Sequence, residues 1–361
     1  MTLRNKRTMT NHGLLAQRHA PLGLISRVAD CCFWFGRYVE RAEATARSLQ
    51  ATLNLALDGE LAPEHCWQPA VIVTGESADF TTRFGPDAFA DGEIVQNFLV
   101  WDEACAVSLK CSIAGARENA RSIREVLSGD VWEFVNEAYL WLGTPAAEEE
   151  WRSHRDSFYR RVRQLTQLCL GLLRSTMLHD TALDFIWLGV MLERANQTAR
   201  LLDVHHHAFA GMAGTTHQVV ETSVWLALLR ACSGVEPFMK THTGRVTAER
   251  VVRFLVGDSR FPRSVTYAVH AAYERFCYLR PMSDVGLPGE KSLLRLAALD
   301  AWLQDRSDAD LVGPGLHAVL THIVDETATV ASLMGQELLG YGPAPDTEPA
   351  TPAAPSAPSE G

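Results

Sequence analysis

The sequence lacks the cysteine patterns that hold metals or cross-link small domains. Its eight cysteines include no CxxC pair and are scattered through apolar stretches, so neither a zinc site nor a disulfide framework is indicated. Buried free thiols are the expected state. The chain also has no GxxxxGKS/T loop, no GxGxxG turn, no GxSxG elbow and no HExxH helix. We therefore predict no directly bound cofactor, no autonomous nucleotide binding and no familiar proteinase chemistry.

Positive charge is scarce as well. The 33 basic residues against 43 acidic ones give a formal net charge of −10, which argues against a nucleic-acid partner. No stretch reaches the roughly 18 unbroken apolar residues that a membrane span needs. The basic start of the chain is a poor signal peptide, because no apolar segment with a cleavage site follows it. The sequence thus predicts a cytoplasmic protein with no nucleic-acid or membrane partner.

Alternating strand patterns are almost absent, and helical periodicity dominates the chain. With 361 residues and 47% hydrophobic content, the chain can bury a sizeable core. We predict an all-α fold, an elongated helical bundle, with a flexible arm over 1–22, one domain over 23–340 and a disordered tail rich in proline and alanine over 341–361. The first helix is expected over Leu24–Leu57, and the region 60–100 is expected to be irregular. Further helices are expected over 102–127, 130–143, 149–178, 181–209, 219–232, 246–256, 262–279, 290–305 and 311–339.

An internal repeat carries the strongest signal. Residues 34–49 align without gaps to residues 187–202, and nine of the sixteen positions are identical, including a tryptophan and an adjacent Glu-Arg pair. Such self-similarity indicates duplicated structural units. We call the two segments the motif helices, and we predict that they pack against each other by pseudo-twofold symmetry.

Two neighbouring stripes of matched residues run along each motif helix at about 100° per residue. The first carries Gly36, Glu40 and Arg47, matched by Gly189, Glu193 and Arg200; the second carries Trp34, Arg41 and Thr45, matched by Trp187, Arg194 and Thr198. Glycine lowers helix stability, so its place in each motif indicates a close approach of two backbones. The charged groups are expected to lie near that contact.

Two interpretations of the charged cluster remain open. In the first, buried Glu-Arg bridges fix how the helices pack, because a lone buried charge is very costly. In the second, the cluster is a pocket for a carboxylate or another anion. Arginine would then supply bidentate donors, and Glu40 and Glu193 would orient them or act as acid/base groups.

The motif resembles the alpha-E family, a bacterial all-helical family with a Glu-Arg motif. The likeness covers approximately residues 24 to 340. Its matching pieces are 24–47, Ala116–Arg121, Trp132–Asn136, the second motif helix and Pro262–Val265.

This resemblance implies particular partner proteins. Members of the family are typically encoded or fused with a circularly permuted ATP-grasp protein, and often accompanied by a transglutaminase-like protease. Such partners suggest ATP-driven formation of a peptide or amide bond, with ATP and magnesium held by the ATP-grasp partner. The alpha-E protein would be a partner, a substrate holder or a second enzyme.

Two further groups of polar residues are candidates for binding a ligand. Arg117, Glu118, Asn119 and Arg121 form a charged helix face that could join the pocket, although such a run more often faces solvent. The histidines over 205–207 point in different directions on a helix, so we predict no metal ligand there.

The leading hypothesis is a component of an ATP-grasp-dependent ligation system. It would bind a carboxylate-bearing substrate or the partner enzyme through Arg41, Arg47, Arg194 and Arg200, with Glu40 and Glu193 as orienting or acid/base groups. A non-catalytic adaptor with purely structural Glu-Arg pairs is the first alternative. An independent enzyme acting on a small metabolite by acid–base chemistry is the second.

Overall fold

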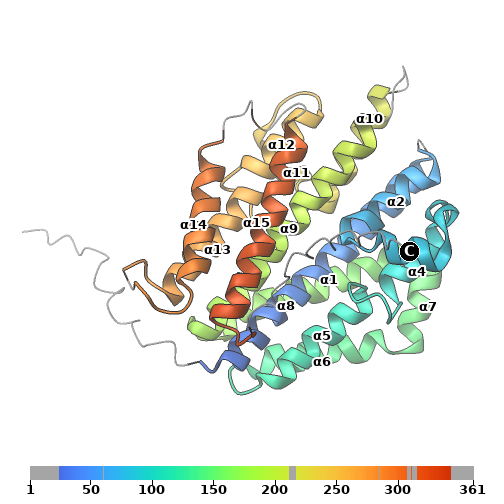
Figure 1. Cartoon of the computed structure of the whole chain (residues 1–361). Helices are drawn as coiled ribbons and strands as arrows, with labels where there is room; N and C mark the ends of the chain where they lie inside the picture. The colour runs from blue at the N-terminus through green and yellow to red at the C-terminus, as the bar shows by residue number, and fades with distance from the viewer. Residues whose placement is uncertain are drawn as a thin grey trace, which may run out of the picture.

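The computed structural model describes residues 24–59, 61–210, 217–283, 285–306, 310 and 315–342. The arm predicted over 1–22 lies outside these residues, as does all of the predicted tail except Tyr341 and Gly342. The described part is α-helical and contains no strand, which confirms the predicted fold class (Figure 1). Its elements are, in chain order, α1 (Ser26–Asp58), α2 (Pro63–Thr74), α3 (Ser77–Phe84), the 3-10 helix η2 (Pro86–Ala90), α4 (Gly92–Val100), α5 (Leu109–Ser122), α6 (Gly129–Leu142), α7 (Pro145–Ser153), α8 (Arg155–Thr176), α9 (Thr181–Ala210), α10 (His217–Ala231), α11 (Val235–Thr241), α12 (Ala248–Gly257), α13 (Val265–Leu279), α14 (Glu290–Gln304) and α15 (Leu316–Glu337).

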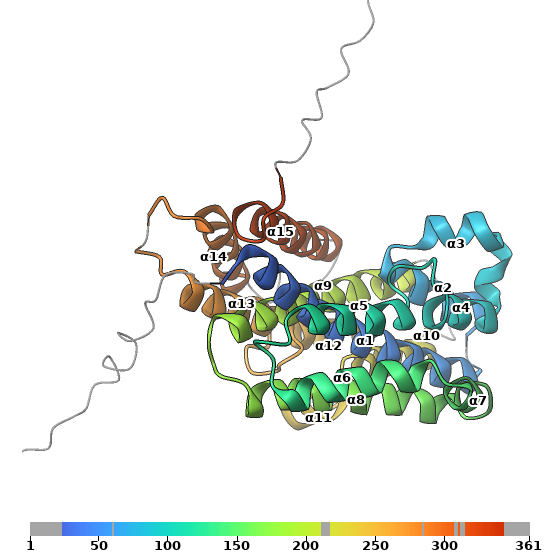
Figure 2. The ribbon, with the colours of Figure 1, turned by 90° about the horizontal axis from the view of Figure 1, so that it is seen from below.

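Two four-helix groups contain most of the helical residues that the structure describes. In the first group α1 packs on α5 and α8, and α6 packs on both of those helices. In the second group α9 packs on α13 and α15, and α14 packs on both. Figure 1 shows α13, α14 and α15 on one side of the central pair α1 and α9, and α5, α6 and α8 on the other. The short helices α2, α3 and α4 gather at the far end from α13, α14 and α15 (Figure 2).

The repeat therefore extends well beyond the sixteen residues that the sequence showed. By their order and contacts, α1, α5, α6 and α8 correspond to α9, α13, α14 and α15. Corresponding helices also begin alike: Ser108 accepts a hydrogen bond from the main-chain N–H of Cys111 at the start of α5, and Ser264 accepts one from Tyr267 at the start of α13. Serine is a favoured N-cap because its hydroxyl satisfies a free N–H of the first turn.

The motif helices form the seam between the two groups. Gly36 of α1 approaches Ile186 of α9, and further along Arg47 lines the same small space as Leu201, so α1 and α9 run parallel. A Cβ atom on Gly36 would lie 2.1 Å from the main-chain oxygen of Ile186, and one on Gly189 would lie 2.1 Å from that of Phe33. Only glycine permits this approach. The predicted pseudo-twofold packing is thereby confirmed.

Two properties of the described residues bear on the predicted class of protein. None of the described helices combines the length and the apolar character needed to cross a membrane. All eight cysteines are described, and each is a free thiol.

Candidate functional site

The Glu-Arg pairs cross the seam reciprocally. Glu40 of α1 accepts two hydrogen bonds from Arg194 of α9, at 2.9 and 2.7 Å. Glu193 of α9 accepts two from Arg41 of α1, at 2.7 and 3.1 Å. Each motif helix thus supplies the carboxylate for one pair and the guanidinium for the other. The pseudo-twofold relation places one pair on each side of the seam.

The cluster around Glu40 is filled by protein charges. Arg263, just before α13, donates to Glu40 at 2.9 Å and to Glu43 at 2.6 Å, while Arg47 donates to Glu43 at 3.0 Å. Burial alone would raise the pKa of Glu43, but Arg47, Arg263 and Arg194 lower it to about 2. Burial lowers the pKa of Arg47 to about 10. The space left between these groups is only about 30 Å³.

The cluster around Glu193 is arranged differently. Arg37 donates from Nε to this carboxylate at 2.8 Å, and Gln197 donates at 3.1 Å, in addition to Arg41. Burial would raise the pKa of Glu193, but the charges of Arg37 and Arg41 hold it well below its usual range. Glu193 is therefore ionised at neutral pH, and its oxygens are occupied in fixing the two guanidinium groups.

A cavity of about 400 Å³ opens beside Glu193, and we call it the motif cavity. Its walls come from α1, α9 and α15, with single contributions from α2, from the segment before α5 and from the segment after α15. The lining residues are Phe33, Trp34, Arg37, Arg41, Thr45, Thr74, Val107, Glu193, Asn196, Gln197, Arg200, Ala328, Ala331, Ser332 and Tyr341. Three guanidinium groups thus face one carboxylate, so two positive charges among the lining residues are unbalanced.

Two exchanges between the halves explain why only one side is open. Glu43 on α1 corresponds to Asn196 on α9, which removes a carboxylate from the motif cavity. Arg263 directly precedes the N-cap serine of α13, and Val107 holds the same place before α5. The short valine leaves empty the space that the Arg263 side chain fills on the other side. The result is a closed cluster and an open cationic cavity.

Arg200 supplies the least compensated charge in the cavity. Its Nε atom is buried and has no hydrogen-bond partner in the structure. No ion pair to its guanidinium group occurs among the described residues. Arg37 and Arg41, by contrast, are held by Glu193 and also by aromatic rings. The guanidinium carbon of Arg37 lies 5.2 Å from the centre of the Trp34 ring, and that of Arg41 lies 5.6 Å from the centre of the Tyr38 ring. A buried donor without a partner is costly, and a bound anion would relieve that cost.

Tyr341 closes one edge of the motif cavity. Its hydroxyl donates to Asp30 at 2.6 Å and accepts from the Trp34 indole at 2.6 Å. Burial and Asp30 raise the pKa of Tyr341 to about 12, so the hydroxyl keeps its proton. Gly335 makes room for the ring, because a Cβ there would lie 2.2 Å from it. The sequence had placed Tyr341 at the start of the tail, yet it forms part of the cavity wall.

The comparison with known families agrees with this geometry. The Alpha-E family, a predicted alpha-helical domain with a conserved ER motif, matches residues 24–338. The chain belongs to the Alpha-E family. In this Alpha-E chain, the adjacent Glu-Arg residues of each motif helix therefore form the ion pairs that cross the seam.

Relatives of this Alpha-E chain include uncharacterised proteins of Mycobacterium bovis and Mycobacterium tuberculosis, each 24% identical over 256 residues. The match covers 67% of this chain but only 28% of each relative. The chain therefore spans less than a third of the length of these relatives. No solved structure matches the chain.

The structure places the predicted site residues of the motif helices in two separate clusters. Arg41 and Arg200 lie at the motif cavity with Glu193, whereas Arg47 and Arg194 lie in the closed cluster with Glu40. They therefore do not form one pocket, because neighbouring residues of a helix face different sides of the seam. The catalytic roles of Glu40 and Glu193 stay predictions.

The predicted charged face on α5 does not line the motif cavity of this Alpha-E chain. Arg117 donates to Asn136 of α6 at 3.1 Å, and Asn119 donates to its own helix. Glu118 and Arg121 pair with each other on the surface. Arg37, by contrast, was missed as a site residue. Its spacing from Trp34 and Arg41 puts it on the second stripe, which is the signal that could have found it.

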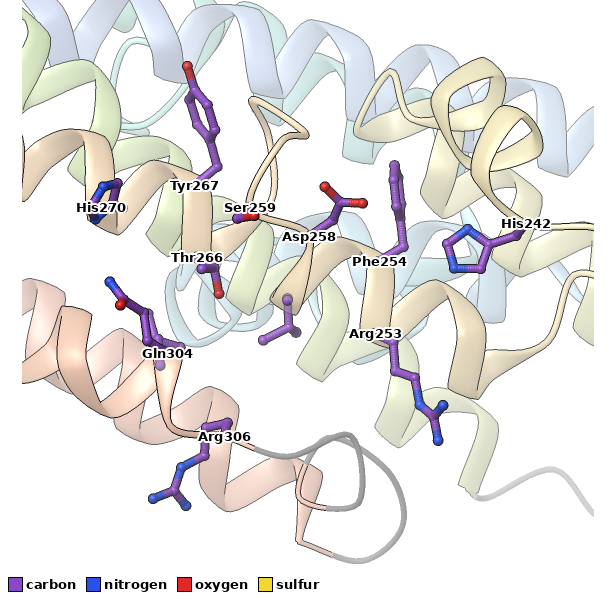
Figure 3. A pocket seen from close by; sticks show the side chains of 13 residues that line it. His242, Arg253, Phe254, Asp258, Ser259, Thr266, Tyr267, His270, Gln304 and Arg306 are labelled. Atoms are coloured by element: carbon purple, nitrogen blue, oxygen red, sulfur yellow. The ribbon is translucent and has the colours of Figure 1, made fainter.

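A larger hollow of about 680 Å³ lies between the α12–α13 region and the end of α14. Figure 3 shows Tyr267, Asp258 and His242 along one side, with Gln304 and Arg306 on the other. Several of its charged groups already have protein partners: Arg253 pairs with Glu249, Asp258 pairs with Arg260, and His270 contacts the buried carboxylate of Asp300 at 3.1 Å. We therefore regard the smaller motif cavity as the candidate site of this Alpha-E protein.

Proposed function

We propose that this protein holds an anionic group, a carboxylate by preference, in the motif cavity. The observation that carries the proposal is the pair of unbalanced arginine charges, with Arg200 unpaired at the cavity wall. Guanidinium groups bind carboxylates through two parallel hydrogen bonds. The cavity volume of about 400 Å³ lies within the range of small-molecule sites.

The geometry favours an orienting role for Glu193 over proton transfer. A general acid or base works best with a pKa near the operating pH. The pKa of Glu193 is lowered instead, and its two oxygens accept hydrogen bonds from Arg37, Arg41 and Gln197. Glu193 would thus fix the two arginines so that their remaining N–H groups can meet a ligand. Glu40 would serve the packing of the seam.

We further propose that the anion belongs to a substrate of an ATP-grasp-dependent system that forms peptide or amide bonds. This step rests on membership of the Alpha-E family. In that system a circularly permuted ATP-grasp protein would bind ATP and magnesium and activate the carboxylate, and a transglutaminase-like protease is a further candidate partner. The free thiols support a reducing, cytoplasmic location. The Alpha-E chain would present or retain the substrate.

The test is to co-purify the chain with an ATP-grasp protein encoded beside it, and to measure ATP hydrolysis and ligation with pools of amino acids and peptides. Arg200→Met should reduce ligation by about tenfold or more, because loss of a charged hydrogen-bond donor is worth about 1.5–3 kcal/mol. It should leave the complex and the thermal stability intact. Arg121→Met, which removes an exposed arginine of α5, is the matched control.

Three results would decide between the hypotheses. A complex whose activity is the same with Arg200→Met would reject the anion site and support the adaptor. Turnover by the isolated chain without any partner would support the independent enzyme. Absence of both complex and activity would reject the ligation system. A calorimetric titration of the isolated chain with the same pools tests anion binding separately from the ligation assay.

A further inference from the structure

Three potential metal ligands meet where the end of α9 lies beside the start of α15. Asp203 and His207 are one helical turn apart on α9, and His317 is the second residue of α15. One ligand atom from each residue lies within 4.8 Å of the other two. No local sequence pattern connects them, because His317 is 114 residues from Asp203.

Both imidazole rings approach the same carboxylate oxygen. The Nδ1 atom of His317 lies 2.8 Å from Oδ1 of Asp203, and Nδ1 of His207 lies 3.5 Å from it. The two rings lie edge to face with their centroids 4.4 Å apart. Nδ1 of His207 also lies 3.0 Å from the main-chain oxygen of Asp203, so this nitrogen carries the ring proton and Nε2 is the atom left to bind a metal. Ligands bound at 2.0–2.2 Å in a tetrahedral site are roughly 3.3–3.5 Å apart, and the three candidate ligand atoms lie within 4.8 Å of one another, so shifts of about 1 Å would bring them to that spacing.

A hydrogen bond between His317 and Asp203 would by itself join the two helices. It does not account for the second imidazole at the same oxygen. Two imidazoles and one carboxylate are a ligand set that Zn²⁺ and neighbouring transition metals accept, with positions left for water or substrate. His207 and His317 are half exposed, so an ion can reach them from solvent.

We infer that Asp203, His207 and His317 form a binding site for a divalent first-row transition metal, Zn²⁺ in the first place. The bound ion joins α9 to α15. These are two of the helices that wall the motif cavity, but the three ligands lie outside it, so the inference does not rest on the proposed function. The expectation of no metal ligand at 205–207 rested on the directions of the consecutive histidines and included neither Asp203 nor His317.

The test is a calorimetric titration of the full, untagged chain with ZnCl₂, and a parallel titration with MgCl₂. We expect one saturable Zn²⁺ site per chain and no Mg²⁺ site, since imidazole is a poor ligand for Mg²⁺. His207→Ala and His317→Ala should each weaken Zn²⁺ binding at least about tenfold, because even outer-shell changes at metal sites cost 10–100-fold. Zn²⁺ should also raise the melting temperature of the wild-type chain and not that of the variants.

His322→Ala is the matched control. His322 lies on α15 and its Nδ1 is 4.0 Å from a Glu326 oxygen, but no third ligand joins this pair among the described residues. Its replacement should leave the affinity for Zn²⁺ unchanged. Unsaturable binding, or equal affinity in the wild type and in the double variant His207→Ala with His317→Ala, would overturn the inference. Melting temperatures of the variants without metal show whether they are folded.

Discussion

At the scale of single residues, equivalent side chains of the two halves perform different tasks. Glu40 is tied to Arg194 and Arg263 in the closed cluster, while Glu193 fixes two arginines at an open cavity. The repeat was enough to predict that these glutamates matter. It could not predict their partners, because each pair joins residues about 150 positions apart. Asn196 and Val107 matter because they leave the motif cavity open, and a local sequence pattern does not reveal empty space in the fold.

Glu43 should make the stability of the protein strongly dependent on pH. Its pKa of about 2 in the folded state lies below the value near 4.3 of an unfolded chain. Its ionised form therefore stabilises the fold above pH 4.3, and this contribution is lost as the pH falls from about 4.3 towards 2. Glu43→Gln should lower the free energy of unfolding at pH 7 by about 3–5 kcal/mol, as expected when one partner of a buried ion pair is removed.

Urea denaturation at several pH values measures this effect. The variant should show a shallower loss of stability in acid than the wild type. Glu118→Gln is the control, because Glu118 pairs with Arg121 on the surface, where ion pairs contribute little. Parallel pH profiles for Glu43→Gln and the wild type would contradict the assignment.

At the scale of helices, periodicity predicted the longer elements. The short elements α2, α3, η2 and α4 lie in the region 60–100 that was expected to be irregular, and α11 lies in none of the predicted segments. A single helix was expected over 149–178, but the chain breaks at His154 between α7 and α8. The break allows Trp151 and Phe158 both to contact the Trp101 ring, at centroid distances of 6.0 and 5.7 Å. No glycine or proline marks this position. Such a break is decided by distant residues, so local propensity could not reveal it.

The seam between α1 and α9 should not tolerate a methyl group. Gly36→Ala would place a Cβ against the main chain of α9, which cannot yield as a flexible side chain can. We expect a loss of about 1–3 kcal/mol in the free energy of unfolding, the usual cost of overpacking. Gly171→Ala on the exposed face of α8 meets nothing within 4 Å and should instead stabilise by about 0.5–1 kcal/mol. Thermal and chemical denaturation of both variants provides the comparison, and equal shifts would be inconsistent with close backbone contact.

At the scale of the whole molecule, the chain consists of two related four-helix groups joined along one seam. The sequence predicted two related halves from sixteen aligned residues. It did not show that the correspondence continues through α5, α6 and α8, because the residues that cover those helices have diverged. Packing geometry tolerates such divergence as long as volume and patterning are kept.

Chains divided between His179 and Asp180, before α9, should assemble when produced together. Each half alone would expose its motif helix, with charges that are buried only in the complete protein. We expect each half to be insoluble or poorly folded alone, and the two to co-purify as a one-to-one complex. Size-exclusion chromatography of the separate and joint products distinguishes these outcomes. A monomeric, well-folded first half would show that the seam is dispensable.

The distance along the chain between the motif helices also has a consequence during synthesis. Glu40 and Arg194 are 154 residues apart, so α1 leaves the ribosome well before its partner exists. At the usual 5–20 residues per second, that interval is on the order of 10 to 30 s. During this time Glu40 and the face of α1 that carries Gly36 have no partner helix to pack against. Nascent chains of this protein should therefore depend on a chaperone, or on a loosely packed first half, until α9 has been made.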